Sequence, residues 1–386
     1  MARLVLRNLF KHPIRSLLTV GSLVVALFLL CILRSLVTTL GAGVEAANEQ
    51  RLWVQSAVSL FVDLPTSYQS KIEAVEGVGS VGKWQWFGGY YQDPGNFFAQ
   101  FAVDPEELFD MYPEVEIVEG SKEAFFSRRT SCVIGESLAQ DFDWRIGDTV
   151  PIIGALFPQP DGSAWEFEVA AIYHPTKPNF DNRTLFFHWD YFAQTMREID
   201  GEEPNVGTFV IKLESGADAT AVMATVDELF ANGPQRVQTT TEAEFNRQFV
   251  SMIGNLPRFI GAIGGGVFVA ILLACVNTML MAGREQIHDV GILKALGFSG
   301  GSVLALLLVQ SMVLCSIGGG IGIALAWMSS PGISAAMGQF FPGYEVKPAT
   351  LVLAAAITLG IGLLAGIFPA WQASKRSPVE DLRATL

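Results

Sequence analysis

The residues of this chain that most resemble catalytic or ligand-binding residues form a near match to a phosphate-binding loop. Gly77–Lys83 reads GVGSVGK, which puts glycine and lysine where the pattern G-x-x-x-x-G-K-[ST] requires them. The next residue is Trp84, which has no hydroxyl to bind Mg²⁺, so the motif fails at its metal ligand. We therefore interpret this segment as a turn that leads into a strand.

Histidines are the next candidates for chemistry, and the chain has 4 of them. His174 and His188 have aspartates between them, which leaves a metal site open as one alternative and separate surface or core histidines as the favoured one. No G-x-S-x-G or H-E-x-x-H motif is present. We predict that this chain holds no catalytic residue, no metal and no cofactor of its own.

Composition indicates a membrane protein with one acidic soluble domain. Hydrophobic residues make up 50% of the chain and charged residues 16%, against about 25% charged in a typical soluble domain. Residues 41–257 hold 33 Asp/Glu and 13 Lys/Arg, a net charge of −20, whereas the rest holds 5 and 12, a net charge of +7. A domain this acidic is a poor ligand for nucleic acid, because it cannot neutralise phosphates.

Four apolar runs are long enough to cross a bilayer, which takes about 20 helical residues. The charges within these runs are Arg34, near the outer end of the first, and Arg258, the first residue of the second, so no buried proton relay is predicted. We expect the first run to be an uncleaved span. The predicted spans are residues 17–40, 258–282, 302–328 and 349–371, with a short external loop at 329–348.

Basic residues near the ends of the spans predict their direction. Arg3, Arg7, Lys11 and Arg15 recur every four residues, which places them on one face of an amphipathic helix over residues 1–16. We interpret it as a helix on the inner leaflet of the membrane, in contact with lipid; a targeting signal is the alternative. The N-terminus and the tail at 372–386 are then cytoplasmic, and residues 41–257 lie outside.

The outer domain is predicted to be mixed α/β. β-rich runs occupy Ala57–Val62, Trp165–Ile172, Thr184–Phe187 and Thr208–Leu213, and helical runs occupy Thr66–Val75, Glu136–Phe142 and Asp218–Ala231. Aromatic residues are dense between Trp84 and Phe101, which indicates either a core with one sheet face or an exposed aromatic surface. The predicted fold is a four-helix transmembrane bundle with a mixed α/β extracytoplasmic domain inserted between the first and second spans.

Small residues indicate close contacts between the spans. Three pairs fit G-x-x-x-G: Gly261/Gly265, Gly318/Gly322 and Gly362/Gly366. We predict that they are helix contacts, with a dimer interface as a more specific alternative.

The cytoplasmic loop at 283–301 differs from an inert connection. Its central part reads REQIHDVGILKALGFS from Arg284 to Ser299, and its apolar positions form a helix face interrupted by Gly291 and Gly297. A short helix held between two spans can carry force from a soluble partner into the membrane. An inert hairpin between spans is the alternative.

This loop resembles the signature of FtsX-like, MacB-type ABC transporter permeases, in which R-E-I-G-I-L-K-A-L-G-A-S is typical. The matching residues here are His288–Ser299, and the family's Arg-Glu pair appears as His288 and Asp289, which keeps the acid and makes the cation titratable. Ser377–Arg383 resembles the family's closing P-x-E-A-L-R, and Ile134–Ile153 resembles its I-G-x-x-L-A…G-D-x-V pattern.

The resemblance implies the permease subunit of an ABC complex, which works as a homo- or heterodimer in the bacterial inner membrane. ATP and Mg²⁺ would be bound by a separate cytoplasmic ATPase, whose work moves the outer domain to export or extract a hydrophobic substrate, lipid or lipoprotein. An adaptor protein is a further partner, and activation of an external cell-wall hydrolase is the alternative function. The residues expected to couple to the ATPase are Arg284, Glu285, His288, Asp289, Gly291, Lys294 and Gly297.

Overall fold

The computed structural model describes residues 13–45, 47–177, 180–252, 256–337 and 343–375. The chain divides into a helical unit, Met1–Thr39 with Asn255–Leu386, and an α/β unit, Leu40–Gly254. Arg3, Arg7 and Lys11 lie outside the described residues, as does the tail from residue 376, so the basic helix and the tail remain predictions. The backbone of Arg15 belongs to the first described helix, which begins at Pro13.

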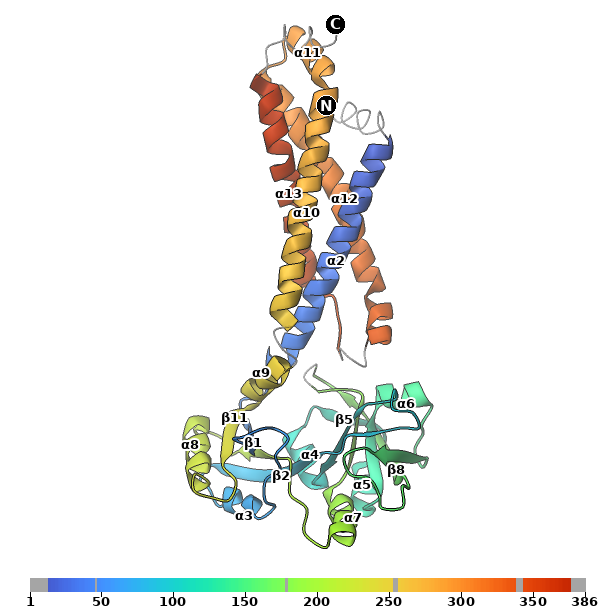
Figure 1. Ribbon diagram of the computed structural model, residues 1–386, viewed down its shortest axis with the longest axis vertical. Helices are drawn as coiled ribbons and strands as arrows, with labels where there is room; N and C mark the ends of the chain where they lie inside the picture. Colours follow the sequence, from blue (N-terminus) through green and yellow to red (C-terminus); the bar gives the residue numbers. More distant parts are fainter. Residues whose placement is uncertain (1–12, 46, 178–179, 253–255, 338–342, 376–386) are drawn as a thin grey trace. The chain divides into compact units, whose positions relative to one another are not determined.

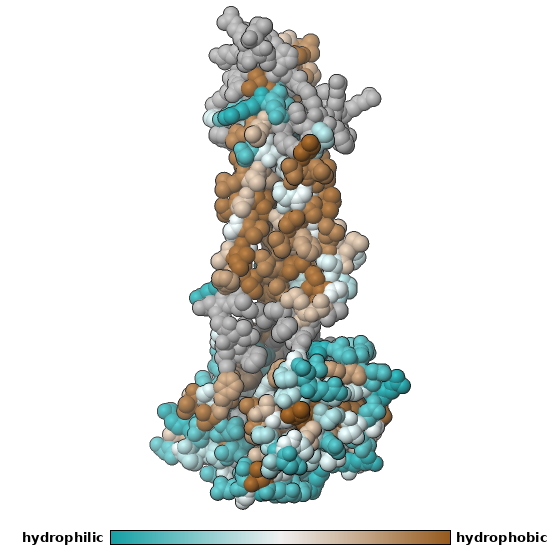
Figure 2. Space-filling view, turned by 45° about the vertical axis from the view of Figure 1, so that its right-hand side comes forward, coloured by the Kyte–Doolittle hydropathy of each residue, from teal (hydrophilic) through white to brown (hydrophobic). Residues whose placement is uncertain are grey.

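The helical unit contains four apolar helices that are long enough to cross a membrane (Figure 1). Their apolar spans are Ser16–Thr39, Arg258–Glu285, Gly300–Ser334 and Pro348–Gln372, and Figure 2 shows hydrophobic side chains gathered over them. The helices share one core, in which Leu27, Cys275, Leu314 and Ile361 are buried. The helices of this unit are α2 (Pro13–Glu45), α10 (Leu256–Glu285), α11 (Ile287–Ala295), α12 (Gly300–Met337) and α13 (Pro348–Lys375).

Two of the three predicted glycine pairs are helix contacts within the chain. A Cβ on Gly318 would lie 2.7 Å from Leu23 Cβ, and one on Gly322 would lie 2.6 Å from the Val24 carbonyl oxygen, so these glycines let α12 approach α2 closely. Gly362 and Gly366 do the same for α13 against α12. The third pair, on α10, meets no described atom of this chain within 4 Å.

The end of α12 corrects one predicted boundary. The sequence places a loop from residue 329, because Pro331 removes a backbone donor, but the helix continues through Pro331 to Met337. The hydroxyl of Ser329 donates a 3.2 Å hydrogen bond to the Ala326 carbonyl one turn earlier. Pro331 itself removes only the bond to the Trp327 carbonyl, and a membrane helix can continue through one such loss.

The α/β unit is built on one mixed sheet of 11 strands (Figure 1). Strand order is β11-β1-β10-β2-β4-β9-β6-β8-β7-β3, with β5 paired to β8. Most pairs are antiparallel, whereas β4 with β9 and β6 with β8 are parallel. The strands are β1 (Arg51–Ser56), β2 (Val78–Trp86), β3 (Gly89–Tyr90), β4 (Ala99–Val103), β5 (Val115–Gly120), β6 (Ser131–Gly135), β7 (Thr149–Gly154), β8 (Trp165–Pro175), β9 (Thr184–His188), β10 (Thr208–Leu213) and β11 (Val237–Thr241).

Alternate residues of the central strands enter two separate cores, one on each face of the sheet. In β10, Phe209 and Ile211 join the first core and Val210 joins the second. This is the period of two expected when helices cover both faces of a sheet. The first core is covered by α3 (Tyr68–Glu73), α6 (Glu136–Phe142), α7 (Trp189–Asp200) and α8 (Ala219–Leu229), the second by α4 (Pro105–Met111) and α5 (Lys122–Ser127), and α9 (Glu242–Met252) follows β11.

The strand predicted at Ala57–Val62 is wrong, because the strand is β1, which ends at Ser56. Serine side chains turn the backbone here: Ser56 Oγ accepts from the Val58 N–H at 3.2 Å, and Ser59 Oγ accepts from the Phe61 N–H at 3.3 Å. Such local bonds compete with strand pairing, so an apolar run that reads as a strand forms a loop.

Candidate functional site

The segment between α10 and α12 contains the short helix α11, as the sequence predicts. The long helix α10 ends at Glu285, and Gln286 interrupts it with φ −90° and ψ 5°. Val290 is 3% exposed and packs with Val303 and Leu307 of α12 and Ala370 of α13. One face of α11 is therefore fixed to two of the apolar helices.

A second apolar face of this segment is exposed. Ile292, Leu296 and Phe298 have exposed fractions of 42%, 73% and 44%. Ile292 and Leu296 are four residues apart, so they lie on the same face of the helix. Large apolar side chains gathered in this way mark a surface that contacts another molecule.

The end of α11 is set by Gly297, which has φ +93°. The Gly297 N–H donates to the Lys294 carbonyl at 3.0 Å, and the Phe298 N–H donates to the Leu293 carbonyl at 3.1 Å. These two bonds form a Schellman cap, for which glycine is the favoured residue. Gly297 therefore positions Phe298 by ending the helix.

The structure places the other predicted coupling residues as follows. Arg284 and Glu285 are exposed at the end of α10, Lys294 is half-buried, and Gly291 is buried within α11. The backbone of His288 and Asp289 belongs to α11, and their side chains lie outside the described residues.

Sequence reasoning emphasised the polar residues and missed the division of the apolar ones. It treated Val290, Ile292, Leu296 and Phe298 as one face, whereas Val290 points into the unit and the other three are exposed. No signal within the segment separates them, because burial of Val290 depends on its contacts with α12 and α13.

The near match to a phosphate loop is a strand, as predicted. Val78–Trp86 forms β2 directly after Gly77, which turns the chain with φ +90°. Lys83 Nζ lies 3.0 Å from Asp104 Oδ1 and donates to Gln69 Oε1 at 2.9 Å. Its lysine is therefore engaged by side chains of the α/β unit.

The two histidines of the α/β unit have different surroundings. His174 Nδ1 lies 2.9 Å from Glu136 Oε2, and this pair is exposed. His188 is buried, with Nε2 2.7 Å from the Phe125 carbonyl oxygen, and burial lowers its pKa. The structure therefore agrees with the favoured alternative of separate surface and core histidines. Among the described residues, no group of three or more His, Cys, Asp and Glu side chains is arranged to hold a metal ion.

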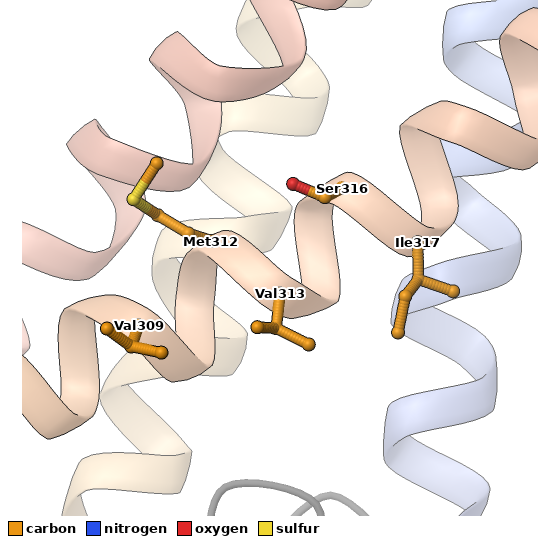
Figure 3. Close-up of a pocket in the computed structure, with 5 residues that line it drawn as sticks. All are labelled: Val309, Met312, Val313, Ser316 and Ile317. Carbon is orange, nitrogen blue, oxygen red and sulfur yellow. The ribbon is translucent and has the colours of Figure 1, made fainter. Parts of the chain in front are cut away.

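The apolar helices carry two shallow hollows. One, of about 430 Å³, is lined by Val309, Met312, Val313, Ser316 and Ile317 of α12 (Figure 3). The other, of about 810 Å³, follows α2 from Leu17 to Leu29 and includes Val267 of α10. Their linings are almost wholly apolar, which suits the acyl chains of lipids rather than a reaction.

Comparison with known protein families accounts for both units. Residues 16–229 match the MacB-like periplasmic core domain, and residues 261–378 match the FtsX-like permease C-terminal domain. The chain belongs to the FtsX/MacB-type family of ABC transporter permeases. Membership agrees with the resemblance seen between Arg284 and Ser299. The permease is a multi-pass membrane protein.

Curated relatives match this permease over different lengths. It is 22% identical to an uncharacterized ABC transporter permease of Methanocaldococcus jannaschii, over 98% of this chain and 96% of that protein. It is 24% identical to the macrolide export ATP-binding/permease protein MacB of Neisseria gonorrhoeae, over 53% of this chain and 31% of MacB. The permease thus spans nearly all of the first relative and about a third of the second.

Solved structures with similar segments include the periplasmic region of MacB from Actinobacillus actinomycetemcomitans. That match has 12% identity and a TM-score of 0.39, and it covers 53% of this chain and 95% of the other. The extracellular domain of the transporter YknZ matches with 10% identity and a TM-score of 0.35, over 50% of this chain and 98% of the other.

Proposed function

We propose that this permease converts ATP hydrolysis by a separate cytoplasmic ATPase into movement of its α/β unit, for export or extraction of a hydrophobic substrate, lipid or lipoprotein. The observation that carries the proposal is α11 with its C-terminal cap, which is fixed by Val290 on one side and exposes Ile292, Leu296 and Phe298 on the other. A soluble ATPase that binds the exposed side would push on α12 and α13 through the buried one.

In this proposal the four apolar helices lie in a bacterial inner membrane, with both termini cytoplasmic and the α/β unit outside, between the first and second spans. A second permease subunit completes the complex. The glycine pair Gly261 and Gly265 of α10 supports this, because it meets no described atom of this chain within 4 Å. ATP and Mg²⁺ belong to the ATPase, and an adaptor protein and lipid are further partners.

The first test changes the exposed apolar residues. Leu296→Asp combined with Ile292→Asp puts two charges where the ATPase would bury apolar surface, so the variant should lose the ABC ATPase that co-purifies with wild type. Leu156→Asp is the matched control, because Leu156 is 60% exposed in the α/β unit. Recovery of the same ATPase with the double variant would overturn the coupling role of α11.

The second test concerns the residues that the sequence nominated. Asp289→Lys together with Gly291→Phe changes the charge and bulk of α11, and we expect ATPase activity that no longer drives the function of the complex. Unchanged activity and unchanged co-purification of the ATPase would reject this assignment. The same purification tests the alternative function. If a cell-wall hydrolase is recovered with the complex in place of an adaptor or lipid cargo, the proposed function becomes regulation of that hydrolase instead of transport.

A further inference from the structure

The first strand and the last helix of the α/β unit are joined side chain to side chain. Three alternate residues of β1 contact three residues of α9 spaced by three. Alternate strand residues share one face of a sheet, and residues three apart share one face of a helix. We call this set of contacts the clasp, and its pairs are Arg51 with Glu242, Trp53 with Phe245, and Gln55 with Gln248.

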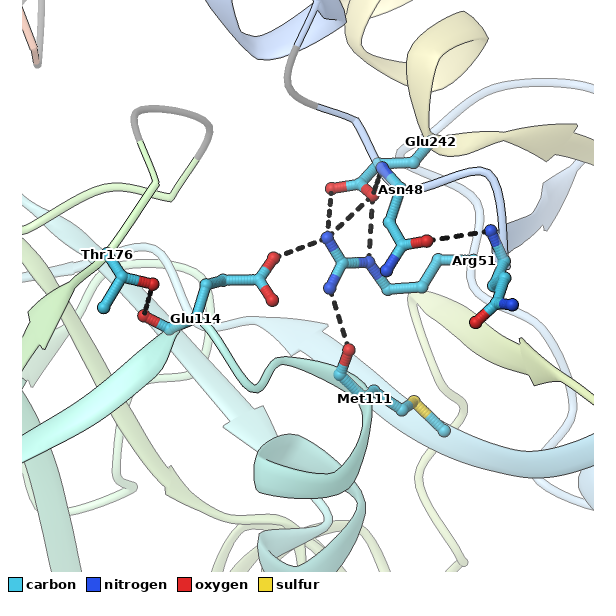
Figure 4. Close-up of polar contacts among 7 residues, drawn as sticks. Asn48, Arg51, Met111, Glu114, Thr176 and Glu242 are labelled. Carbon is cyan, nitrogen blue, oxygen red and sulfur yellow. Dashed lines mark hydrogen bonds and ion pairs between the residues drawn. The ribbon is translucent and has the colours of Figure 1, made fainter. Parts of the chain in front are cut away.

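The first pair of the clasp is a buried ion pair (Figure 4). Arg51 is 1% exposed, and it donates from Nε to Glu242 Oε2 at 2.9 Å and from Nη2 to Glu242 Oε1 at 3.1 Å. The same carboxylate accepts from the Asn48 N–H at 2.7 Å. Glu242 therefore holds the chain just before β1 as well as β1 itself.

Arg51 also reaches a third segment, the connection between α4 and β5 (Figure 4). Its Nη2 donates to Glu114 Oε1 at 2.5 Å, its Nη1 donates to the Met111 carbonyl at 2.8 Å, and the Tyr112 ring lies 4.2 Å from the guanidinium carbon. Met111 and Tyr112 belong to the second core of the sheet, so the clasp is tied into the body of the α/β unit.

The other two pairs continue the contact along α9. The rings of Trp53 and Phe245 stack with centroids 4.0 Å apart and planes 14° apart. Gln55 Nε2 donates to Gln248 Oε1 at 2.8 Å. The ion pair, the ring stack and the hydrogen bond between the two side-chain amides follow one another along the helix. Together they fix both the position and the rotation of α9 on β1.

The clasp joins the two segments through which the chain enters and leaves the α/β unit. The chain enters the α/β unit from α2 and reaches β1 within a few residues, and it leaves through α9 towards α10. We infer that the clasp is a permanent joint, which makes the two chain ends of the α/β unit move together and delivers displacement of α2 and α10 to the sheet as one rigid movement. This inference rests on the proposed function and names the residues that transmit the movement.

The experiment measures the distance between spin labels at Val58→Cys in the α/β unit and Val352→Cys in the helical unit, in the complex with its ATPase, with and without ATP and vanadate. Both positions are highly exposed, at 76% and 70%, and the four native cysteines are buried, so labels attach selectively. Trp53→Ala, Phe245→Ala and Glu242→Gln together remove the ring stack and the charge of the ion pair, and we call this chain the open variant. We expect the wild-type distance to shift with nucleotide and the open variant to lose the shift while ATP hydrolysis continues.

A thiol cross-link separates loss of the joint from loss of folding. Gln55→Cys with Gln248→Cys, bridged by a short bifunctional thiosulfonate, should keep the shift in the otherwise wild-type chain and restore it in the open variant. In these bridged chains positions 58 and 352 carry a ketone-bearing amino acid with a ketone-reactive spin label instead of cysteine, so the thiosulfonate reacts only with the cysteines at 55 and 248. A shift that survives in the unbridged open variant, or that bridging abolishes, would overturn the permanent joint alone. A wild-type complex with no shift would overturn the proposed function, and the joint with it.

Discussion

Replacing Arg51 by methionine should be among the most destabilising single changes in the α/β unit. Methionine fills much of the same volume but leaves two carboxylates without their cation: Glu114, whose side chain is 1% exposed, and Glu242, at 6%. Removing one partner of a buried ion pair typically costs about 3–5 kcal/mol. Two carboxylates share this cation, and one keeps the Asn48 donor, so we take the same range for the whole change.

That free energy corresponds to a large thermal shift. For a unit of this size, each kcal/mol lowers Tm by about 2–4 °C, so Arg51→Met should lower it by about 6–20 °C. Tryptophan fluorescence of the full chain in detergent is the measurement, because 6 of the 8 tryptophans lie in the α/β unit. The control is Arg145→Met, which removes an exposed pair with Asp143 and should change the stability by less than about 0.5 kcal/mol.

Two further measurements test the cause of the loss. Adding Glu114→Gln and Glu242→Gln removes the unpaired charges, so the triple variant should recover most of the stability. Lower pH should also reduce the difference in stability between wild type and Arg51→Met. Burial by itself would raise the pKa of Glu114, but the hydrogen bond from Arg51 and other donors outweigh it and lower that pKa.

A lowered pKa contributes stability that is present above the ordinary value of about 4.3 and is lost as pH falls through the lowered value. Wild type therefore keeps this stability at pH 4.5. In Arg51→Met, burial acts on Glu114 without the opposing cation and raises its pKa, so the unpaired carboxyl takes up a proton and the two chains should converge between neutral pH and about pH 4.5. A loss no larger than that of the control, or one that is equal at both pH values, would refute the assignment of Arg51 as the cation that stabilises the clasp.

Two other predictions concern single positions. Burial raises the pKa of Asp181 to about 6. Its protonation therefore contributes stability that is complete below the ordinary pKa of aspartate and is lost as pH rises through about 6. Asp181→Asn should stabilise the chain by at most about 3 kcal/mol at pH 7.5 and by much less at pH 4, as measured by Tm. Gly366→Ala places a Cβ 2.8 Å from Ser311 Cβ and should lower the free energy of unfolding of the helical unit by about 1–3 kcal/mol, seen as a lower Tm. Gly360→Ala on the same helix meets no atom within 4 Å and should leave Tm unchanged. Equal effects of the two alanines would show that the close contact of α13 with α12 contributes nothing.

Much of the architecture could be predicted because it depends on composition and period. The four apolar helices follow from unbroken apolar runs, and the helix at Glu136–Phe142 has the predicted limits. The two errors have different causes. Local side-chain bonds of Ser56 and Ser59 turn an apolar run into a loop, and α12 continues past Pro331 because a proline removes only one backbone bond of a helix.

The candidate sites were less predictable, for two different physical reasons. In α11 the pattern shows which residues are apolar but not which of them contact α12 and α13, since that depends on helices elsewhere in the chain. The clasp depends on pairs that lie 191 and 63 residues apart, Arg51 with Glu242 and with Glu114. No local signal distinguishes Arg51 from an exposed arginine at the start of a strand.

The exposed face at α11 and the clasp between β1 and α9 lie in different units of the chain. Transmission from the first to the second therefore requires contacts inside the helical unit. α11 contacts α12 and α13 through Val290, whereas the chain ends of the α/β unit continue into α2 and α10. Displacement of α11, as the proposed function has it, would reach α10 directly across Gln286 and also through α13, since a Cβ on Gly283 of α10 would lie 3.6 Å from Pro369. It would reach α2 through α12, because a Cβ on Gly318 or Gly322 would lie within 2.7 Å of α2. A close-packed contact of this kind has little free volume to absorb a shift, so we expect movement of α12 to be passed on to α2.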